Sequence, residues 1–323
     1  MQSSNSKQWL ACVIGGLLLL LAALPFMAHA QSLKVATGDP KGTYSKMFKE
    51  LTNACATTLT ISEVPTNGSM TNIDKLAGNE VNAAIVQTDV LKFRSNNEDL
   101  SSIKTLVALH PEAVHIIARN ETFKVGGTMG FGGKEVSLNT INDLAGRKVG
   151  AIGGSVITAQ VMRIQAEIPY QVISFPDGST NDTALASLAK KEIDAVIAVG
   201  GFPLAWASGL GPQYKMLSIP ESTAAKLKNV YSTTRVTYAK MGATGVQTVA
   251  TDALFVTREY KTAKYVDGLS KLRSCFYANL DDLKETTGNH PAWSKVSADT
   301  KGKWVWYDLP ETQAQAATPA RKR

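Results

Sequence analysis

The sequence predicts an α/β protein of two lobes that enclose a ligand cleft. Short apolar segments alternate with segments of helical periodicity along most of the chain, which is typical of α/β folds. The chain has 323 residues, of which 44% are hydrophobic, so it can build about two cores of ordinary size. One succession of short segments also occurs twice, which indicates that the two lobes have related architectures.

The first residues predict an export signal. Lys7 precedes an apolar run from Trp9 to Met27, and Ala28-His29-Ala30 follows it. A basic start, an apolar core and an Ala-x-Ala ending are typical of a secretory signal peptide, and we place cleavage after Ala30. The run is also long enough for a retained membrane anchor, but its small-residue ending favours cleavage. We therefore expect residues 1–30 to be removed and the mature protein to be periplasmic.

Ten apolar segments with strand character follow the export signal. In chain order they are 33–37, 59–64, 82–87, 104–110, 113–119, 148–152, 170–175, 193–199, 214–219 and 246–257. Their short length and the turn residues that bound them favour strands over buried helices. Because segments of helical periodicity separate most of them, the pattern predicts an α/β fold.

Helical stripes and a polar tail complete the chain. The two clearest stripes consist of Tyr44, Met47, Phe48, Leu51 and Cys55, and of Tyr265, Val266, Leu269, Leu272 and Phe276. Apolar residues at this spacing form one face of an amphipathic helix. From residue 311 onward the chain is rich in Ala, Gln and Thr and ends in Arg321-Lys322-Arg323. This composition predicts a disordered basic tail at 311–323.

The internal repeat spans residues 61–85 and 172–197. Each copy contains a strand, a proline, a Gly-Ser turn, a helix and a second, buried strand. The turn is Gly68-Ser69 in the first copy and Gly178-Ser179 in the second. Two copies in the same order argue for two similar lobes, and the interface between domains is where small ligands commonly bind.

Small-residue turns at the ends of strands predict where a ligand binds. Four such junctions are Gly42-Thr43-Tyr44, Gly68-Ser69, Gly153-Gly154-Ser155 and Gly200-Gly201-Phe202. Backbone N–H groups at a helix N-terminus favour an anion, glycine lets a ligand approach the backbone, and Ser or Thr adds a hydroxyl. Ordinary capping is the better explanation for any single turn. Four turns at similar ends of two lobes favour a ligand cleft.

Some polar residues near these turns have two interpretations. Gln87 and Asp89 end a buried strand, where they either cap the next helix or face the cleft. Tyr44 lies on an apolar stripe, so it either packs in the core or stacks on a ligand. Three basic residues could pair with a carboxylate, although each is more typical of a solvated surface; they are Lys41, Arg94 and Arg163.

The sequence contains none of the motifs that we associate with catalysis, metals or nucleic acids. Beyond Ala30 the histidines are His110, His115 and His290, and neither His-Glu-x-x-His, Cys-x-x-Cys nor Gly-x-Ser-x-Gly occurs. The Gly-rich segment 126–133 lacks the Walker pattern and is more typical of a hairpin or flap. The net charge is +7, and the basic residues do not cluster outside the tail. We expect no enzyme activity, no metal, no cofactor and no nucleic-acid partner.

Cys55 and Cys275 are the cysteines that follow the predicted signal peptide, and both lie beside apolar helical stripes. An exported protein reaches an oxidising compartment, where such a pair forms a disulfide. Two buried free thiols are the alternative. We predict the disulfide.

The same residues resemble the TAXI family of extracytoplasmic solute-binding proteins, which serve TRAP transporters. The family motifs correspond to Val35–Tyr44, Asn67–Asn72, Ala84–Asp89, Asp143–Val149, Asp252–Arg258 and His290-Pro291-Ala292. The match covers most of residues 33–295. It differs at Ser45–Phe48, where the family has Tyr-Pro-Leu-Gly, and in residues 126–133, which look like an insertion.

The resemblance implies a two-lobed periplasmic-binding-protein type II fold, with a central ligand cleft and a hinge of crossover strands. We expect residues 31–118 plus 247–310 in lobe I and residues 119–246 in lobe II. The expected ligand-binding residues are Gly38, Thr43, Tyr44, Gly68, Ser69, Gln87, Asp89, Gly154, Ser155, Gly201 and Phe202.

The function implied by the resemblance is solute capture. A monomer would close its lobes on a small organic anion, usually a carboxylate, and deliver it to the membrane subunits of a TRAP-type permease. The alternative is a periplasmic ligand-sensing protein that signals to a membrane histidine kinase. Both functions use the same fold, so the residues do not separate them.

Overall fold

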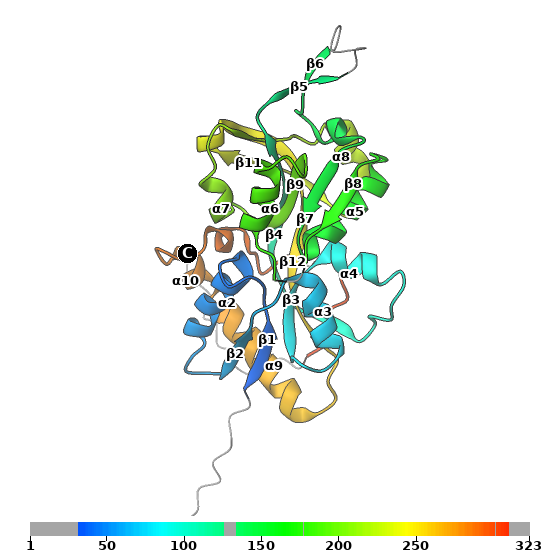
Figure 1. Cartoon of the computed structure of the whole chain (residues 1–323). Coiled ribbons are helices and arrows are strands. Elements are labelled where there is room, and N and C mark those ends of the chain that lie inside the picture. Colours follow the sequence, from blue (N-terminus) through cyan, green and yellow to red (C-terminus); the bar gives the residue numbers. More distant parts are fainter. Residues whose placement is uncertain (1–31, 126–133, 177, 301, 310–323) are drawn as a thin grey trace, which may run out of the picture. The chain divides into compact units, whose positions relative to one another are not determined.

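The computed structural model describes residues 32–125, 134–176, 178–300 and 302–309 (Figure 1). The predicted signal peptide, the Gly-rich segment 126–133 and the predicted basic tail lie outside these residues. Within the described ranges, no helix has both the length and the apolar composition that a membrane span requires.

One mixed sheet runs through the molecule in the order β2-β1-β3-β12-β4-β9-β7-β8, with β10 on β4 and β11 on β12. Its strands are β1 (Leu33–Ala36), β2 (Ile61–Val64), β3 (Ala83–Gln87), β4 (Ile103–Arg119), β7 (Lys148–Ala151), β8 (Gln171–Ser174), β9 (Ala195–Gly201), β10 (Tyr214–Met216), β11 (Ser232–Tyr238) and β12 (Ala243–Arg258). A separate hairpin pairs β5 (Thr122–Val125) with β6 (Lys134–Ser137).

The strands form two groups around the central pair of β4 and β12. Strand β1 pairs in parallel with β2 and β3, and β7 pairs in parallel with β8 and β9. Every residue of β3 is buried, as expected for a parallel strand that is covered on both faces. Figure 1 shows the two groups, with β4 and β12 extending into both. We call the group with β1 the first lobe and the group with β7 the second lobe.

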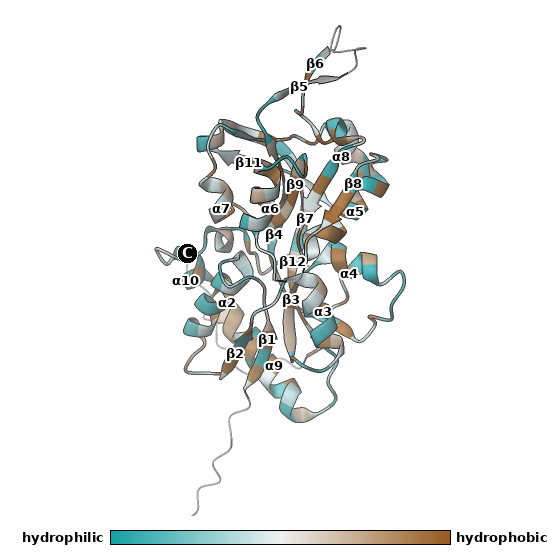
Figure 2. Cartoon of the chain, in the orientation of Figure 1, coloured by the Kyte–Doolittle hydropathy of each residue, from teal (hydrophilic) through white to brown (hydrophobic). Residues whose placement is uncertain are grey.

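Helices cover the sheet in both lobes. They are α2 (Thr43–Ala54), α3 (Ser69–Ala77), α4 (Thr88–Arg94), α5 (Gly154–Gln165), α6 (Asn181–Ala189), α7 (Ala205–Ser208), α8 (Glu221–Leu227), α9 (Ala263–Ala278) and α10 (Leu280–Glu285). Three short 3₁₀ turns are η2 (Ile141–Leu144), η3 (Ala239–Met241) and η4 (Pro291–Lys295). The stripe predicted on α2 is buried at Met47, Phe48 and Leu51. In Figure 2, β8 and β9 have apolar colours, whereas the outer turns of α4 are hydrophilic.

The change from one lobe to the other occurs inside β4 and β12. Strand β4 pairs with β9 from Glu112 to Ala118, and β12 pairs with β3 from Ala253 to Thr257. Pro111 lies opposite Asp252, and the register of β12 against β4 shifts directly after Asp252. Proline cannot donate to the ladder, so a chain bend is tolerated there.

This geometry corrects the sequence prediction at one point. We predicted two strands, 104–110 and 113–119, because Pro111 interrupts the apolar run. The structure contains one strand, β4, that continues through Pro111, and Pro111 lies beside an irregular position of β12, where proline is tolerated.

A disulfide joins Cys55, directly after α2, to Cys275 in α9. Both half-cystines lie in a core cluster with Leu33, Phe48 and Leu269. The predicted disulfide is therefore confirmed. It connects residues that are 220 positions apart, so it ties α9 to the end of α2 within the first lobe.

Candidate functional site

A cavity of about 680 Å³ lies where turns of the two lobes face each other. The first lobe contributes the segment after β1 and the turn before α3. The second lobe contributes the turn before α5 and the segment from Ala198 to Trp206. The cavity therefore lies at the carboxyl ends of parallel strands, which is where ligands bind in open α/β sheets.

Most of the predicted ligand-binding residues line this cavity. They are Gly38, Thr43, Tyr44, Gly68, Ser69, Gln87, Gly154 and Ser155. Gly201 and Phe202 do not line it, although their neighbours Gly200 and Pro203 do. Gly200 and Gly201 belong to β9 and not to a turn that opens a helix. Whether these residues bind a ligand stays a prediction.

Asp89 lies away from the cavity lining and connects the two lobes. It lies in the first turn of α4, is 1% exposed, and accepts hydrogen bonds from Thr158 of α5 (2.6 Å) and from Tyr231 (2.9 Å). Burial raises the pKa of Asp89, and these hydrogen bonds oppose the shift. Its contacts pack α4 against α5. Neither sequence interpretation describes this role, because Asp89 is absent from the cavity lining and no side chain caps α4, whose N-cap is Gln87.

Glycines occupy the N-cap positions of three helices that open at the cavity, whereas α6, which also opens there, has Thr180 as its N-cap. Gly42 precedes α2, Gly68 precedes α3 and Gly153 precedes α5, and no side chain caps any of the three. Ordinary Ser or Thr capping therefore does not explain these turns. The N-terminal ends of α2, α3 and α5 instead present backbone donors toward one cavity.

Gln87 adds an amide donor to the cavity wall. The hydroxyl of Ser69 donates to Gln87 Oε1 (3.2 Å) and accepts from the backbone N–H of Gln87 (3.0 Å). Gln87 is 4% exposed, and its Nε2 has no partner among the described residues. Ser69 thus orients Gln87, and the Gln87 amide is the group left to bind a hydrogen-bond acceptor.

The Ser155 hydroxyl can donate a hydrogen bond to a ligand in the cavity. The backbone N–H of Val199 donates to Ser155 Oγ at 3.1 Å. This bond uses an acceptor position of the hydroxyl and leaves its O–H free to donate. The bond also ties the start of α5 to β9, so Ser155 is held in a defined place.

The lobes meet through glycine backbones beside the cavity. A Cβ atom on Gly153 would lie 2.0 Å from the carbonyl oxygen of Asn67, and a Cβ atom on Gly154 would lie 2.0 Å from Gln87 Oε1. A Cβ atom on Gly201 would lie 2.7 Å from Thr43 Cγ2. Side chains at these positions would separate the lobes, so glycine permits their close approach.

The sequence analysis missed Glu112, which lines the cavity from β4. The Glu112 side chain is 3% exposed, and its Oε2 accepts a hydrogen bond from the Tyr44 hydroxyl at 2.5 Å. Burial raises the pKa of Glu112 to about 8, while the hydrogen bond from Tyr44 opposes the shift. A charged residue beside Pro111 in an apolar run was the signal that could have revealed it.

Tyr44 both packs in the core of the first lobe and contacts Glu112 at the cavity. Its ring packs against the core cluster of the first lobe, while its hydroxyl reaches Glu112 at the cavity. Core packing is therefore confirmed, and a contact between Tyr44 and a ligand stays a prediction. Burial raises the pKa of the Tyr44 hydroxyl well above its ordinary value, so the hydroxyl stays protonated and donates to Glu112.

Histidines close to this region are neutral. Burial lowers the pKa of His110 to about 3, that of His115 to about 4, and that of His290 to about 4. His110 Nε2 lies 3.8 Å from Glu112 Oε1, which is too long for a hydrogen bond. Because burial disfavours both charged forms, we assign this contact to two neutral groups and not to an ion pair.

These histidines predict a loss of stability in acid. Their unfolded forms take up protons below about pH 6.5, whereas the folded forms stay neutral down to about pH 4, so the unfolding free energy falls as pH falls through this window. His115 Nε2 lies 2.7 Å from the Tyr238 hydroxyl, a bond that glutamine can replace. We expect His115→Gln to reduce the slope by about 1 kcal/mol per pH unit. Denaturant titrations at several pH values test this, and equal slopes would contradict it.

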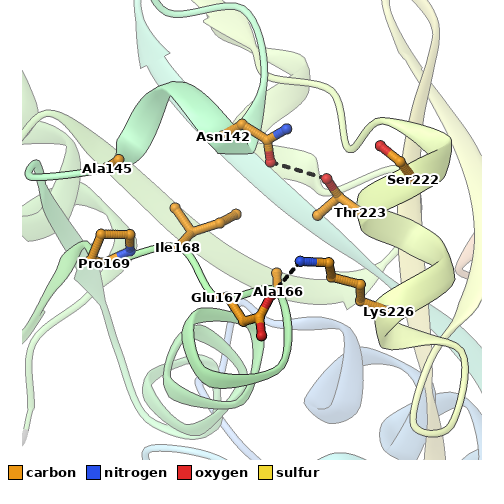
Figure 3. Close-up of a pocket in the computed structure, with 9 residues that line it drawn as sticks. All are labelled: Asn142, Ala145, Ala166, Glu167, Ile168, Pro169, Ser222, Thr223 and Lys226. Carbon is orange, nitrogen blue, oxygen red and sulfur yellow. Dashed lines mark hydrogen bonds and ion pairs between the residues drawn. The ribbon is translucent and has the colours of Figure 1, made fainter.

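A second cavity, of about 330 Å³, lies between η2, the end of α5 and α8 (Figure 3). Its polar groups pair with each other: Lys226 Nζ lies 2.5 Å from Glu167, and the Thr223 hydroxyl donates to Asn142. None of the predicted site residues lines it. The described residues also contain no group of three or more His, Cys, Asp or Glu side chains placed to hold a metal ion.

Comparisons with known proteins agree with this architecture. The profile of the NMT1-like family matches residues 35–303. The ligand-binding component of an ABC-type import system from Staphylococcus aureus, solved with zinc bound, has 13% identity and a TM-score of 0.50, and the match covers 84% of this chain and 80% of that chain. This likeness shows the fold: a two-lobed periplasmic-binding-protein type II fold with a central cleft, as predicted.

Two further solved structures have lower TM-scores. A putative L-cystine ABC transporter protein from Listeria monocytogenes has 14% identity and a TM-score of 0.49, over 85% of this chain and 99% of that chain. The GluR0 ligand-binding core from Nostoc punctiforme, solved with L-glutamate, has 16% identity and a TM-score of 0.44, over 77% of this chain and 93% of that chain.

Proposed function

Since the chain belongs to the NMT1-like family, we propose that it is an extracytoplasmic solute-binding receptor for a small organic anion. Its two lobes close on the solute, and the closed complex delivers it to a membrane transporter. Within this proposal the TAXI-like motifs support a TRAP-type permease as the partner and a carboxylate as the solute. The receptor works as a monomer and performs no covalent chemistry.

The observation that carries the proposal is the set of donors around one cavity. Three helices begin there with glycine at the N-cap, so no side chain caps their first backbone N–H groups. In α5 the N–H groups of Ser155 and Val156 already donate to backbone carbonyls, which leaves that of Gly154 as the donor for the solute. The buried Gln87 amide and the Ser155 hydroxyl add donors from the first and the second lobe. A carboxylate accepts several such bonds at once, and bonds to a charged acceptor are stronger than neutral ones.

The hinge of the proposed receptor lies at Pro111 and Asp252. Both crossover strands change partners there, and the ladder between them is irregular. We retain the predicted lobes of 31–118 plus 247–310 and of 119–246 as a proposal, with the bend inside β4 and β12. A solute that contacts both lobes binds the closed form better, so it shifts the population toward closure.

The disulfide supports the proposed compartment. Cys55 and Cys275 are bonded in the core of the first lobe, and such bonds persist outside the cytosol. This agrees with the Ala-x-Ala ending after the apolar N-terminal run, from which we propose cleavage after Ala30 and a periplasmic location.

Calorimetry with a defined panel tests the proposed function. The panel contains dicarboxylates, amino acids, neutral sugars and inorganic anions, titrated into protein that was purified without refolding. We expect binding of a carboxylate. Tight binding of a neutral sugar with no response to carboxylates would contradict the proposal.

Replacement of Ser155 by alanine tests the contribution of the second lobe. Ser155→Ala removes one hydroxyl donor and leaves the backbone donors in place, so we expect a loss of about tenfold in affinity for the carboxylate. Ser187→Ala is the matched control, because Ser187 lies on α6 outside the cavity and bonds Glu192. Equal affinities of the wild type and Ser155→Ala would remove this hydroxyl from the site.

A further inference from the structure

Glu112 is a buried acid at the proposed hinge, and it lines the cavity in which we propose that an organic anion binds. It follows Pro111 in β4 and lies opposite Thr251 of β12 and Gly201 of β9. Its Oε2 is occupied by the Tyr44 hydroxyl, and the described residues place no Lys or Arg in an ion pair with it. A charged Glu112 carboxylate would lack the cationic partner that a buried charge needs to offset its loss of hydration.

The other titratable groups around Glu112 increase this cost. Asp89 on α4 and Asp252 on β12 both act to raise the pKa of Glu112. His110 and His290 are neutral, so they do not offset a negative charge. The remaining ionisable groups near the cavity are Tyr44, which donates to Glu112, the exposed Lys41 and Lys46, and two further acids of the lining, the half-buried Asp39 and the exposed Asp182.

A bound organic anion would make a charged Glu112 still less favourable. The donors of Gln87 and of the helix N-termini hold the anion in the same cavity that Glu112 lines. Two negative charges in one buried site repel each other, and protonation of one of the two groups removes this repulsion. A protonated carboxyl group also has an O–H to donate, which the carboxylate lacks.

We propose that Glu112 is a specificity-determining residue that acts as a neutral carboxylic acid and donates a hydrogen bond to the bound solute. The inference rests on the proposed function, because it requires an organic anion in the cavity. One carboxyl oxygen accepts from Tyr44, and the protonated oxygen donates to a solute carboxylate. Solutes that present an ammonium group at this position are disfavoured, because the neutral acid offers them no charge.

The proposal predicts proton-linked binding. Below about pH 8 the proton is already present in the solute-free protein, so affinity is constant there. Above that pH the solute must bind together with a proton, and affinity falls by about tenfold per pH unit. Glu112→Gln replaces the acid by a neutral amide that still accepts from Tyr44 and donates to the solute. We expect this variant to lose the pH dependence of affinity that the wild type shows above about pH 8.

The experiment uses glutarate and L-glutamate, which differ in a single ammonium group. Calorimetric titrations between about pH 6 and pH 9 in buffers of different ionisation enthalpy measure both affinity and proton uptake. The matched control is Glu80→Gln, because the Glu80 side chain is exposed and pairs with Lys75 far from the cavity lining. We expect proton uptake with glutarate near pH 9 in the wild type and in Glu80→Gln, and none in Glu112→Gln.

A second measurement follows the protonation of Glu112 in the solute-free protein. It does not require the variant to be stable at every pH. Carbon NMR of protein labelled at the glutamate carboxyl carbons follows the titration of Glu112, whose signal is the one absent from Glu112→Gln. We expect a midpoint near pH 8 in the solute-free wild type. A midpoint below about pH 6 would overturn the proposal, because the acid would then be charged at neutral pH.

The outcomes separate this proposal from the proposed function. If no carboxylate of the panel binds, the proposed function fails and this inference fails with it. If glutarate binds equally well across the pH range, only the inference fails. A preference for L-glutamate that Glu112→Gln abolishes would identify a charged Glu112 that pairs with an ammonium group, and it would also overturn the inference.

Discussion

Removal of the Cys55–Cys275 disulfide is expected to lower the free energy of unfolding by about 3–5 kcal/mol. The bond closes a loop of 220 residues, and the entropy that such a loop loses in the unfolded chain grows with its length. Cys55→Ala with Cys275→Ala removes the bond without leaving a free thiol. The two side chains lie in the core of the first lobe, so the small cavities left there add to the loss.

Denaturant unfolding of oxidised, reduced and doubly substituted protein measures this effect. Reduction of the wild type is the matched control, because it breaks the bond and keeps both side chains. We expect the reduced protein to lose most of the same stability, with a further small loss from the alanines. A difference below about 1 kcal/mol between oxidised and reduced protein would show that the unfolded chain is little constrained by the bond.

The sequence predicted those features of the fold that local pattern controls. Alternation of apolar strands and helical stripes identified the α/β class, and the stripes on α2 and α9 placed Cys55 and Cys275 on the core faces of two helices. The edge strand β11 was missed, because most of its residues are at least partly exposed and it lacks the apolar run that marked the other strands. Its pairing with β12 is a tertiary contact that no local pattern encodes.

The site was predictable where backbone chemistry defines it. The Gly-Ser and Gly-Thr turns at Thr43, Ser69 and Ser155 were recognisable because helix starts carry local signals, and these turns do line one cavity. The partners of individual side chains were not recognisable. Asp89 looked like a cleft residue but bonds Thr158, because α4 packs against α5, a contact between segments far apart in the chain.

Glu112 is a second residue whose role could not be predicted from the sequence alone. Its position in β4 is visible in the sequence as an acid within an apolar run, but its significance depends on Tyr44. These two residues come together only in the folded chain, where the start of α2 lies beside β4. The pKa of a buried acid depends on such long-range neighbours, so it follows from the fold and not from the motif.

The largest expected effect on binding comes from the glycine at the meeting point of the lobes. Gly153 has φ of +54°, and a Cβ atom there would lie 2.0 Å from the Asn67 carbonyl oxygen, which is backbone and cannot rotate away. We expect Gly153→Ala to prevent the turn before α5 from reaching the first lobe. Binding that requires closure should then weaken by at least about a hundredfold, which equals about 2.7 kcal/mol.

Two glycines serve as controls for this prediction. Gly146 has φ of +72°, and a Cβ atom there would have no atom within 4 Å, so Gly146→Ala introduces the same kind of backbone strain without a contact between lobes. Gly38 lines the cavity, but a Cβ atom there would lie 3.7 Å from the nearest atom, an ordinary contact with Tyr44. We expect Gly146→Ala to lower stability and keep affinity, and Gly38→Ala to change affinity little.

Calorimetry and small-angle scattering together decide whether the contact acts through closure. In the wild type, a saturating carboxylate should reduce the radius of gyration, because the bound solute favours the closed form. Gly153→Ala should keep the larger radius at the same solute concentration while its unfolding transition resembles that of Gly146→Ala. Wild-type affinity in Gly153→Ala would mean that the approach of Asn67 and Gly153 is not needed for binding, and the solute would then have to be held by one lobe alone.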